Sequence, residues 1–522
     1  MATATQQHPR GLYVLFTTEM WERFGFYTVN GMLALYVRDA VQGFGFTNAQ
    51  SATLSSWYLG FVYFSPLLGG FVADRFLGFR RAIMLGAVFF MAGYLLLAVP
   101  DSLAMFYLAL TCLVIGNGFF KPNVSSMVGN LYPEGSPLKD KAYLIFYMGI
   151  NIGAFLAPLI AEFVQPRWGF NTAFAVAAVG MLIGLVIFAL SQRHVRHADV
   201  PRRKKHSDFT RNDDSHAHQD AVATAEDLPP VLNERALAMQ AVPEWKRIVA
   251  LIVIFAIVIV FWMIFHQNSI TLTFWANDHT DWNVTGILSN AINPLWIILL
   301  SLPLATFWSW LERKGLEPST PAKMMVGMLL TAASFTILYF AAVHGGYEKP
   351  ALEVAQVSGD QALVRISPEA RAHLGIAIPA TTRGEAGEEL WAVTVPPGDA
   401  LQAGEFLRLD STEGGVLTVG PTRDVSPWWL ILAYGVLSLG ELMLSPMGLA
   451  LVSKVAPIRM RGLMMGGWFA ATAIGNKLTA IGKYWDLWSH SAFFIILAGM
   501  AAAMAVLLLL LLRPLKKAMP GV

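Results

Sequence analysis

Long apolar stretches alternate with short polar connections along nearly the whole chain. Each stretch has roughly 20 residues or more, enough to cross about 30 Å of hydrocarbon at about 1.5 Å per residue. Gly, Pro and charged residues mark the ends of the stretches. The pattern predicts twelve transmembrane helices, at residues 11–38, 51–75, 80–99, 102–128, 141–163, 168–191, 246–275, 284–311, 321–343, 426–452, 459–483 and 490–512.

The spans fall into two sets of six, and the connections within each set are mostly short, which favours antiparallel packing. We therefore predict an all-α membrane protein in which two six-helix bundles enclose a central cavity. Residues 1–191 form the first bundle, and residues 246–343 and 426–522 form the second, with a cytoplasmic tail. The first apolar stretch is long and carries charges, so we interpret it as a retained span and not as a cleaved signal.

Two polar segments interrupt the series of spans. Residues 192–245 form a hydrophilic linker with no stretch able to cross a bilayer, although "NERALAMQAV" could form a short helix on the membrane surface. Residues 344–425 contain "ALVRI", "LWAVTV" and "EFLRL", whose period-two alternation between Gly and Pro residues is typical of strands. We predict a small β-rich insert between spans 9 and 10.

Basic residues determine the expected orientation. Lys and Arg gather in the linker and in the loops on its side, whereas the insert has twelve Asp or Glu against six Lys or Arg. The positive-inside rule then puts the linker and both termini in the cytoplasm and the insert outside. We expect an integral protein of the bacterial inner membrane.

Composition excludes several classes of protein. The chain is 55% hydrophobic and 14% charged, against about 25% charged residues in soluble proteins. The sequence contains no G-x-x-x-x-G-K-[ST] motif, so transport driven by ATP hydrolysis is not supported. No paired catalytic residues or metal-ligand spacing appear, and histidines of the linker lie in a solvated charge run. We expect no enzyme activity, no cofactor, no metal and no nucleic-acid partner. The single cysteine, Cys112, cannot form an intrachain disulfide.

The stretch "TTEMWERFGFY", residues 17–27, contains three charges inside the first span. Glu19, Glu22 and Arg23 are spaced i, i+3 and i+4 and so share one helix face. Each ionisable residue within a span costs about 2.5–3.5 kcal/mol, and such residues usually face a cavity or a partner. A cluster at a helix end, or a structural ion pair, is the alternative interpretation. Lys121 in span 4 would neutralise the excess negative charge of this cluster. Protonation of one glutamate would then free Lys121 to bind an anion.

A single acid, Glu441, lies in span 10 within "YGVLSLGELMLSPMG". It could be a structural glutamate bonded across helices. Together with Lys121 in the other half, however, it would give the cavity one positive and one negative wall. Such a pocket suits a zwitterion with separated ends, and short peptides are solutes of this kind.

Four stretches resemble motifs of the proton-dependent oligopeptide transporter family of the major facilitator superfamily. They are "EMWERFGFY" in span 1, "SPLLGGFVADRFLGFRR" between spans 2 and 3, "YLIFYMGINIGAF" in span 5 and "GELMLSPMGL" in span 10. Their order and spacing are those of the family, and "GNGFFKPNVSSMVGNLY" and "GLMMGGWF" agree as well. The resemblance covers all twelve predicted spans and leaves the insert outside it.

The resemblance implies a role for each matching residue. Glu19, Glu22, Arg23 and Lys121 would form the proton-coupling network. Glu441 would meet the amino terminus of a peptide and Lys121 its carboxylate. Tyr27, Tyr63, Asn151, Asn293 and Trp468 would line the peptide site. For Tyr63 and Trp468 core packing is an equally good interpretation. Asp74, Arg75 and Arg81 resemble the gate-locking charges of the superfamily, although positive-inside topology also explains them.

The chain departs from the family pattern at the outer gate. Asn30 stands where the family often has an arginine, and His266 where it often has a glutamate. Losing both charges keeps the cavity in balance, whereas losing one would leave a buried charge unpaired. We expect Asn30 and His266 to form a neutral gate contact beside the substrate. His266 is either a neutral histidine bonded between helices or a second proton site.

The sequence thus predicts a proton-driven symporter for di- and tripeptides. A carrier of another small anion or zwitterion, such as nitrate or an amino acid, is the alternative within transporters. A receptor that uses the outward insert is the alternative outside them. The expected partners are protons, small peptides and the lipid bilayer; the oligomeric state is left open, and a monomer is compatible with the sequence.

Overall fold

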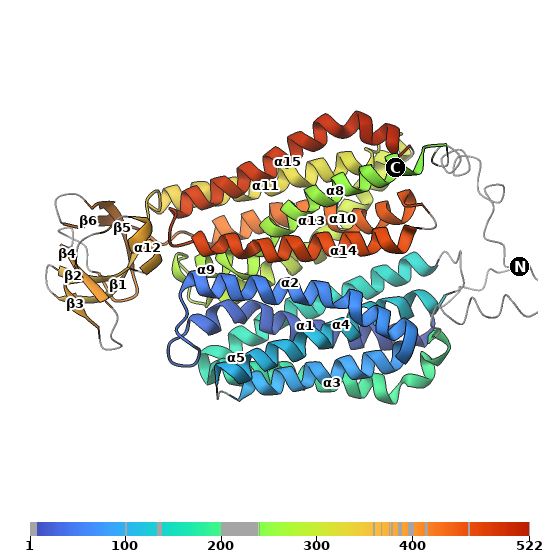
Figure 1. Ribbon diagram of the computed structural model, residues 1–522, viewed down its shortest axis with the longest axis horizontal. Coiled ribbons are helices and arrows are strands. Elements are labelled where there is room, and N and C mark those ends of the chain that lie inside the picture. Colours follow the sequence, from blue (N-terminus) through green and yellow to red (C-terminus); the bar gives the residue numbers. More distant parts are fainter. Residues whose placement is uncertain are drawn as a thin grey trace, which may run out of the picture.

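The computed structural model describes residues 8–99, 102–132, 138–199, 239, 241–358, 361–366, 368–374, 376, 379–384, 389–394, 401–412, 416–457 and 460–520. Most of the predicted linker, including the predicted surface helix apart from residues 239, 241 and 242, lies outside these residues. The molecule is a bundle of long helices with a small sheet at one end (Figure 1).

The first half of the chain supplies five long helices. They are α1 (Arg10–Arg38), α2 (Asn48–Val72), α3 (Phe79–Ala98), α4 (Leu103–Asn130) and α5 (Leu138–Leu190). A π-helical turn, η1 (Ala73–Leu77), extends α2 into the loop before α3, and two short 3₁₀ turns, η2 (Gln192–His194) and η3 (Arg196–Ala198), follow α5. Gly169 has φ 84° and ψ 172°, so α5 is two helices joined at a sharp turn, in agreement with two predicted spans.

The second half contains α8 (Glu244–Phe265), α9 (Thr271–Asp278), α10 (Ser289–Arg313), α11 (Thr320–His344), α13 (Pro427–Val455), α14 (Arg461–Leu478) and α15 (His490–Ala518). Short 3₁₀ segments join some of them: η6 (His266–Ser269), η7 (Gly286–Leu288) and η10 (Thr479–Tyr484). The predicted seventh span is therefore not one continuous helix, because η6 separates α8 from α9. Broken helices at membrane depth commonly border a binding site.

Helices of each half pack mainly on one another, and fewer elements connect the halves. α1 packs on α5 and α3 on α4, while α11 packs on α13 and α15, and α8 on α14. Between the halves, α2 packs on α14 and η10, and α5 packs on α10. Buried aliphatic and aromatic side chains from both halves form one continuous core.

Nine segments of the described chain are helices long and apolar enough to cross a membrane. One of them, Lys141–Leu190, contains two predicted spans. Helices α1 and α14, also predicted as spans, are not among the nine. The helical membrane fold is thus confirmed, and the count of twelve spans stays a prediction.

The predicted β-rich insert is confirmed as a six-stranded antiparallel sheet in the order β3-β4-β2-β1-β5-β6. Its strands are β1 (Ala351–Ser358), β2 (Gln361–Arg365), β3 (Thr382–Arg383), β4 (Glu389–Thr394), β5 (Phe406–Ser411) and β6 (Thr418–Pro421), with a short helix α12 (Pro368–His373). Alternate residues such as Val364 and Leu407 form a separate apolar core.

The insert is attached to the helices by specific contacts. Thr280 and Val425 form a parallel bridge, and the Phe406 ring of β5 lies 4.5 Å from the His279 ring, centroid to centroid. The sheet lies at one end of the molecule and the end of α15 at the other (Figure 1).

Candidate functional site

Arg23 holds a buried charge cluster on α1. Its Nε lies 2.5 Å from Glu22 Oε2, and its Nη2 donates to Glu22 Oε1 at 2.7 Å. The same nitrogen donates to Asn117 Oδ1 of α4 at 3.1 Å, and Nε lies 3.6 Å from Glu19 Oε1. All three charged side chains are at most 2% exposed. The cluster therefore lies inside the protein and not at a solvated helix end.

The two carboxylates of the cluster have different surroundings. Glu22 accepts two charge-assisted hydrogen bonds from Arg23. Neither carboxylate oxygen of Glu19 has a hydrogen-bond partner among the described residues. An ionised carboxylate that is buried without donors is costly, and protonation removes that cost. Glu19 is thus the better placed of the two to accept a proton.

Lys121 of α4 faces the same interior region. Its Nζ lies 5.0 Å from the centroid of the Tyr63 ring of α2. Within the described chain no carboxylate lies within 4 Å of this ammonium group, although Glu19 and Glu22 are near enough to interact with it electrostatically. The cation is therefore close to the cluster and still able to bind an anion.

Glu441 of α13 is the corresponding acid in the second half. Asn293 of α10 donates to its Oε2 at 3.0 Å and to Ser438 Oγ at 2.9 Å. Electrostatic interaction also reaches from Glu441 to Tyr27 and Tyr63 in the first half. One acidic group of the second half is thus oriented by an amide.

The rings of Tyr63 and His266 meet across the two halves, 5.5 Å apart. His266 is buried in η6 and also stacks on Trp262 at 5.3 Å. Asn30 is buried too, but no hydrogen bond joins it to His266 among the described residues. Their predicted gate contact stays a prediction.

Three other predicted site residues make contacts within their own half. The Tyr27 ring lies 5.1 Å from Phe26. The Asn151 amide donates to the Tyr147 carbonyl one turn earlier at 2.9 Å. Trp468 is 3% exposed and packs on Phe255 of α8. Their contact with a peptide stays a prediction.

The predicted gate-locking charges lie around the loop between α2 and α3. Asp74 and Arg75 belong to η1, and Arg81 is exposed at the start of α3. The neighbouring Arg80 forms an ion pair with Asp199, Nε to Oδ2 3.0 Å, and Asp199 also accepts from the Phe79 backbone at 2.8 Å. Sequence reasoning missed this pair, although Asp199 is the first acid after a basic run.

Two polar pairs join the halves at the end that carries the insert. Arg38 Nη2 at the end of α1 lies 2.8 Å from Asp278 Oδ2 at the end of α9. Asn48 at the start of α2 donates to Asp486 Oδ1 at 2.7 Å. Burial raises the pKa of Asp486 to about 6. Sequence reasoning missed all four, and polar residues at facing span ends were the available signal.

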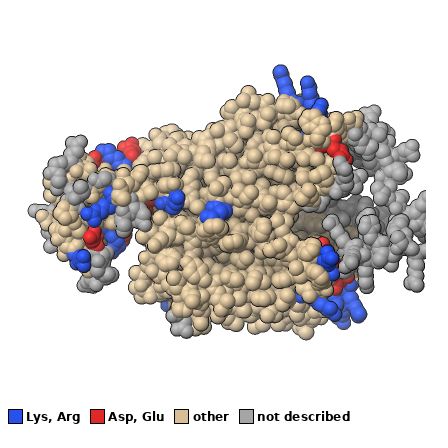
Figure 2. Space-filling model, viewed as in Figure 1, with Lys and Arg blue, Asp and Glu red and all other residues tan. Residues whose placement is uncertain are grey.

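A third contact closes the same end: Glu162 of α5 accepts from the Thr285 backbone at 2.8 Å and from its hydroxyl at 2.5 Å. At the opposite end the space-filling view is hollowed between the two halves (Figure 2). The described contacts therefore close the insert end, and the hollow lies between the halves at the other end.

Known proteins with similar sequences are transporters. A family model described as POT family matches residues 80–368 and 402–483. The chain is 28% identical to "Uncharacterized transporter YclF" of Bacillus subtilis, over 99% of this chain and 96% of that protein. It is 29% identical to "Dipeptide and tripeptide permease A" of Salmonella typhimurium, over 90% and 83% respectively.

Solved structures with the same fold are peptide transporters of this group. One is the peptide transporter POT in complex with sulfate, with 25% identity, a TM-score of 0.72 and coverage of 99% of this chain and 97% of that one. Another is a mutant of a peptide transporter POT in complex with alafosfalin, with 27% identity and a TM-score of 0.72 over the same shares.

Proposed function

Since the chain belongs to the POT family and is an integral membrane protein, we propose that it is a proton-coupled symporter that imports di- and tripeptides. The observation that carries this proposal is the contrast between Glu19 and Glu22. Arg23 donates two hydrogen bonds to the Glu22 carboxylate, whereas Glu19 is buried with no hydrogen-bond donor in the described chain.

Coupling follows from the charges of this region. With Glu19 ionised, Lys121 faces two negative groups and one positive group. A proton taken up by Glu19 from outside removes one of the negative charges, and Lys121 is then better able to bind the carboxylate of a peptide. Loss of that proton to the cytoplasm restores the competition and favours release. Peptide and proton therefore cross together.

A peptide can connect the two halves because its ends carry opposite charges. Lys121 in the first half would bind the carboxylate, and Glu441 in the second half would bind the ammonium group. Asn293 keeps the Glu441 carboxylate oriented. Tyr63, between Lys121 and His266, offers a hydroxyl to the peptide backbone without selecting a side chain. A ligand held from both sides favours conformations in which the halves approach.

Alternating access would rock the bundles, residues 1–191 and 246–522 without the insert, around this site. The closed insert end and the hollow at the opposite end fit the state that releases peptide. We place that hollow, both termini and the linker at the cytoplasm, and the insert outside the inner membrane.

The test is uptake of labelled dialanine by proteoliposomes that contain the purified full chain. An imposed gradient that is acidic outside should drive accumulation above the equilibrium level, and a gradient that is acidic inside should not. Glu19→Gln should abolish accumulation and leave exchange of labelled for unlabelled peptide intact. Accumulation that is unaffected by the proton gradient would refute the proposal.

A further inference from the structure

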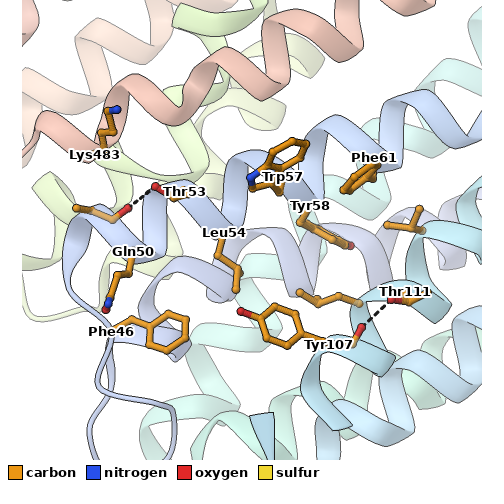
Figure 3. Close-up of a pocket in the computed structure, with 13 residues that line it drawn as sticks. Phe46, Gln50, Thr53, Leu54, Trp57, Tyr58, Phe61, Tyr107, Thr111 and Lys483 are labelled. Atoms are coloured by element: carbon orange, nitrogen blue, oxygen red, sulfur yellow. Dashed lines mark hydrogen bonds between the residues drawn. The ribbon is translucent and has the colours of Figure 1, made fainter. Parts of the chain in front are cut away.

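An apolar groove runs along the outer surface of α2 and α4. Its volume is about 940 Å³, and its walls include Leu54, Trp57 and Phe61 of α2 with Tyr107 and Leu110 of α4 (Figure 3). Trp57 is 50% exposed, Phe61 51% and Tyr107 47%. Because these aromatic side chains are exposed on membrane-spanning helices, we infer that the groove opens toward hydrocarbon.

Two lysines of the second half lie beside this groove of the first half. Lys483 of η10 is exposed and lines the end of the groove near the start of α2 (Figure 3). Lys477 of α14 lies with its Nζ 4.1 Å from the centroid of the Trp57 ring and donates to Ser56 Oγ at 3.2 Å. The space-filling view shows basic side chains in an otherwise uncharged flank (Figure 2).

Neither of these ammonium groups has an acidic partner among the described residues. In the described part of the chain, no carboxylate lies within 4 Å of Lys477 or Lys483. Cations at a hydrocarbon boundary are costly unless they reach water or an anion. An ammonium group at the membrane surface attracts the phosphate of an anionic lipid electrostatically. Cations beside an apolar groove therefore match a molecule with a phosphate head and a hydrocarbon chain.

We propose that an anionic phospholipid binds here, with an acyl chain in the groove of α2 and α4 and its phosphate at Lys477 and Lys483. Such a lipid connects the two halves, since the groove belongs to the first and the lysines to the second. It lies at the same interface between the two halves as the hydrogen bond from Asn48 to Asp486. If the halves separated at this end, the acyl chain in the groove would move away from the lysines that bind the phosphate. The lipid therefore stabilises the state that is closed at the insert end.

The inference rests on the alternating access proposed above, but its test does not use transport. The full chain, with Cys112→Ala, carries spin labels at two exposed loop positions near the insert end, Val41→Cys and Asn283→Cys, one in each half. Distances are measured in nanodiscs of phosphatidylcholine with and without phosphatidylglycerol. Retained phosphatidylglycerol is measured in parallel by native mass spectrometry.

Phosphatidylglycerol should increase the short-distance population several-fold, and the double variant Lys477→Gln/Lys483→Gln should lose both this increase and the retained lipid. The matched control is Lys516→Gln/Lys517→Gln, which removes two lysines from the last turn of α15, far from the insert end. It should respond like the wild type. Thr111→Trp, an exposed position that fills the groove, should also abolish the response with both lysines intact.

Three results would overturn the proposal. The double variant could keep its lipid and its response. Lipid could be retained without any change in distance, which would remove the stabilising role. Soluble inorganic phosphate could reproduce the change in phosphatidylcholine alone, which would make the acyl chain irrelevant. A chain that responds to lipid but carries no peptide would instead refute the proposed function and leave this site standing.

Discussion

Arg38 Nη2 lies 2.8 Å from Asp278 Oδ2, and this ion pair joins the end of α1 to the end of α9 across the two halves. Arg38 also lies over the Phe274 ring, 4.6 Å from its centroid. Arg38 follows the uncharged Asn30 by about two helical turns. This ion pair thus joins the two halves beyond the uncharged Asn30, at the end of α1.

We expect Arg38→Ala to reduce the ratio of closed to open molecules at the insert end by about fivefold, because a partly exposed ion pair contributes about 1 kcal/mol. The measurement is the distance between spin labels at Val41 and Asn283. The charge-swapped variant Arg38→Asp/Asp278→Arg should recover most of the closed population. A swap that behaves like the single variant would show that the pair does not hold this end closed.

Glu19 and Glu22 should respond differently to the same substitution. Glu22→Gln leaves Arg23 buried without its main partner, so it should destabilise the protein by about 3–5 kcal/mol. Glu19→Gln removes a carboxylate that has no hydrogen bond in the described chain, so the thermal unfolding midpoint should stay close to that of the wild type. Thermal unfolding in detergent measures both, and equal destabilisation would contradict the assigned roles.

Lys121→Ala should weaken binding of dialanine by roughly 10- to 100-fold, since a charge-assisted hydrogen bond contributes about 1.5–3 kcal/mol. The variant should also stop discriminating between dialanine and its C-terminal amide. Competition against labelled peptide measures both effects. Glu441→Gln is the matched control: it should lose discrimination at the amino end, between dialanine and its N-acetyl form, and keep discrimination at the carboxyl end.

Acidification should favour closure at the insert end through Asp486. Burial raises its pKa to about 6 from an ordinary value of 3.8, and an open end would expose it to water. The closed state therefore binds the proton more tightly, and its population should rise as the pH falls from 7 to 5. Spin-label distances at both pH values measure this change.

The variant Asp486→Asn should show a smaller pH dependence of those distances than the wild type. Asp281→Asn, which removes an exposed carboxylate from the same end, should leave the wild-type pH dependence in place. If the two variants titrate alike, Asp486 is not the responsible group.

The span pattern and the insert were predictable because both depend on local composition. Apolar length predicts a membrane helix, and period-two alternation predicts a strand. The break at η6 was not predicted, because "FWMIFHQNSI" contains no Gly or Pro to signal it. A tertiary contact stabilises it instead, because Gln267 donates to the Thr479 carbonyl.

The candidate residues could also be named from the sequence, since charges inside apolar spans are costly wherever they pack. Which of these residues pair with one another could not be predicted from the sequence. Glu19 and Glu22 have the same charge and lie on the same helix face, and only the position of the Arg23 guanidinium distinguishes them. The contacts at the insert end join residues as far apart as Asn48 and Asp486.

The sequence by itself determined that this chain spans the membrane and which side chains carry charge into it, because every charge is costly in hydrocarbon whatever it packs against. Only the tertiary structure decided which carboxylate is left without a donor and which end is closed. Hydrogen bonds require atoms within about 3 Å, and the approach of distant segments is set by packing and not by any local pattern.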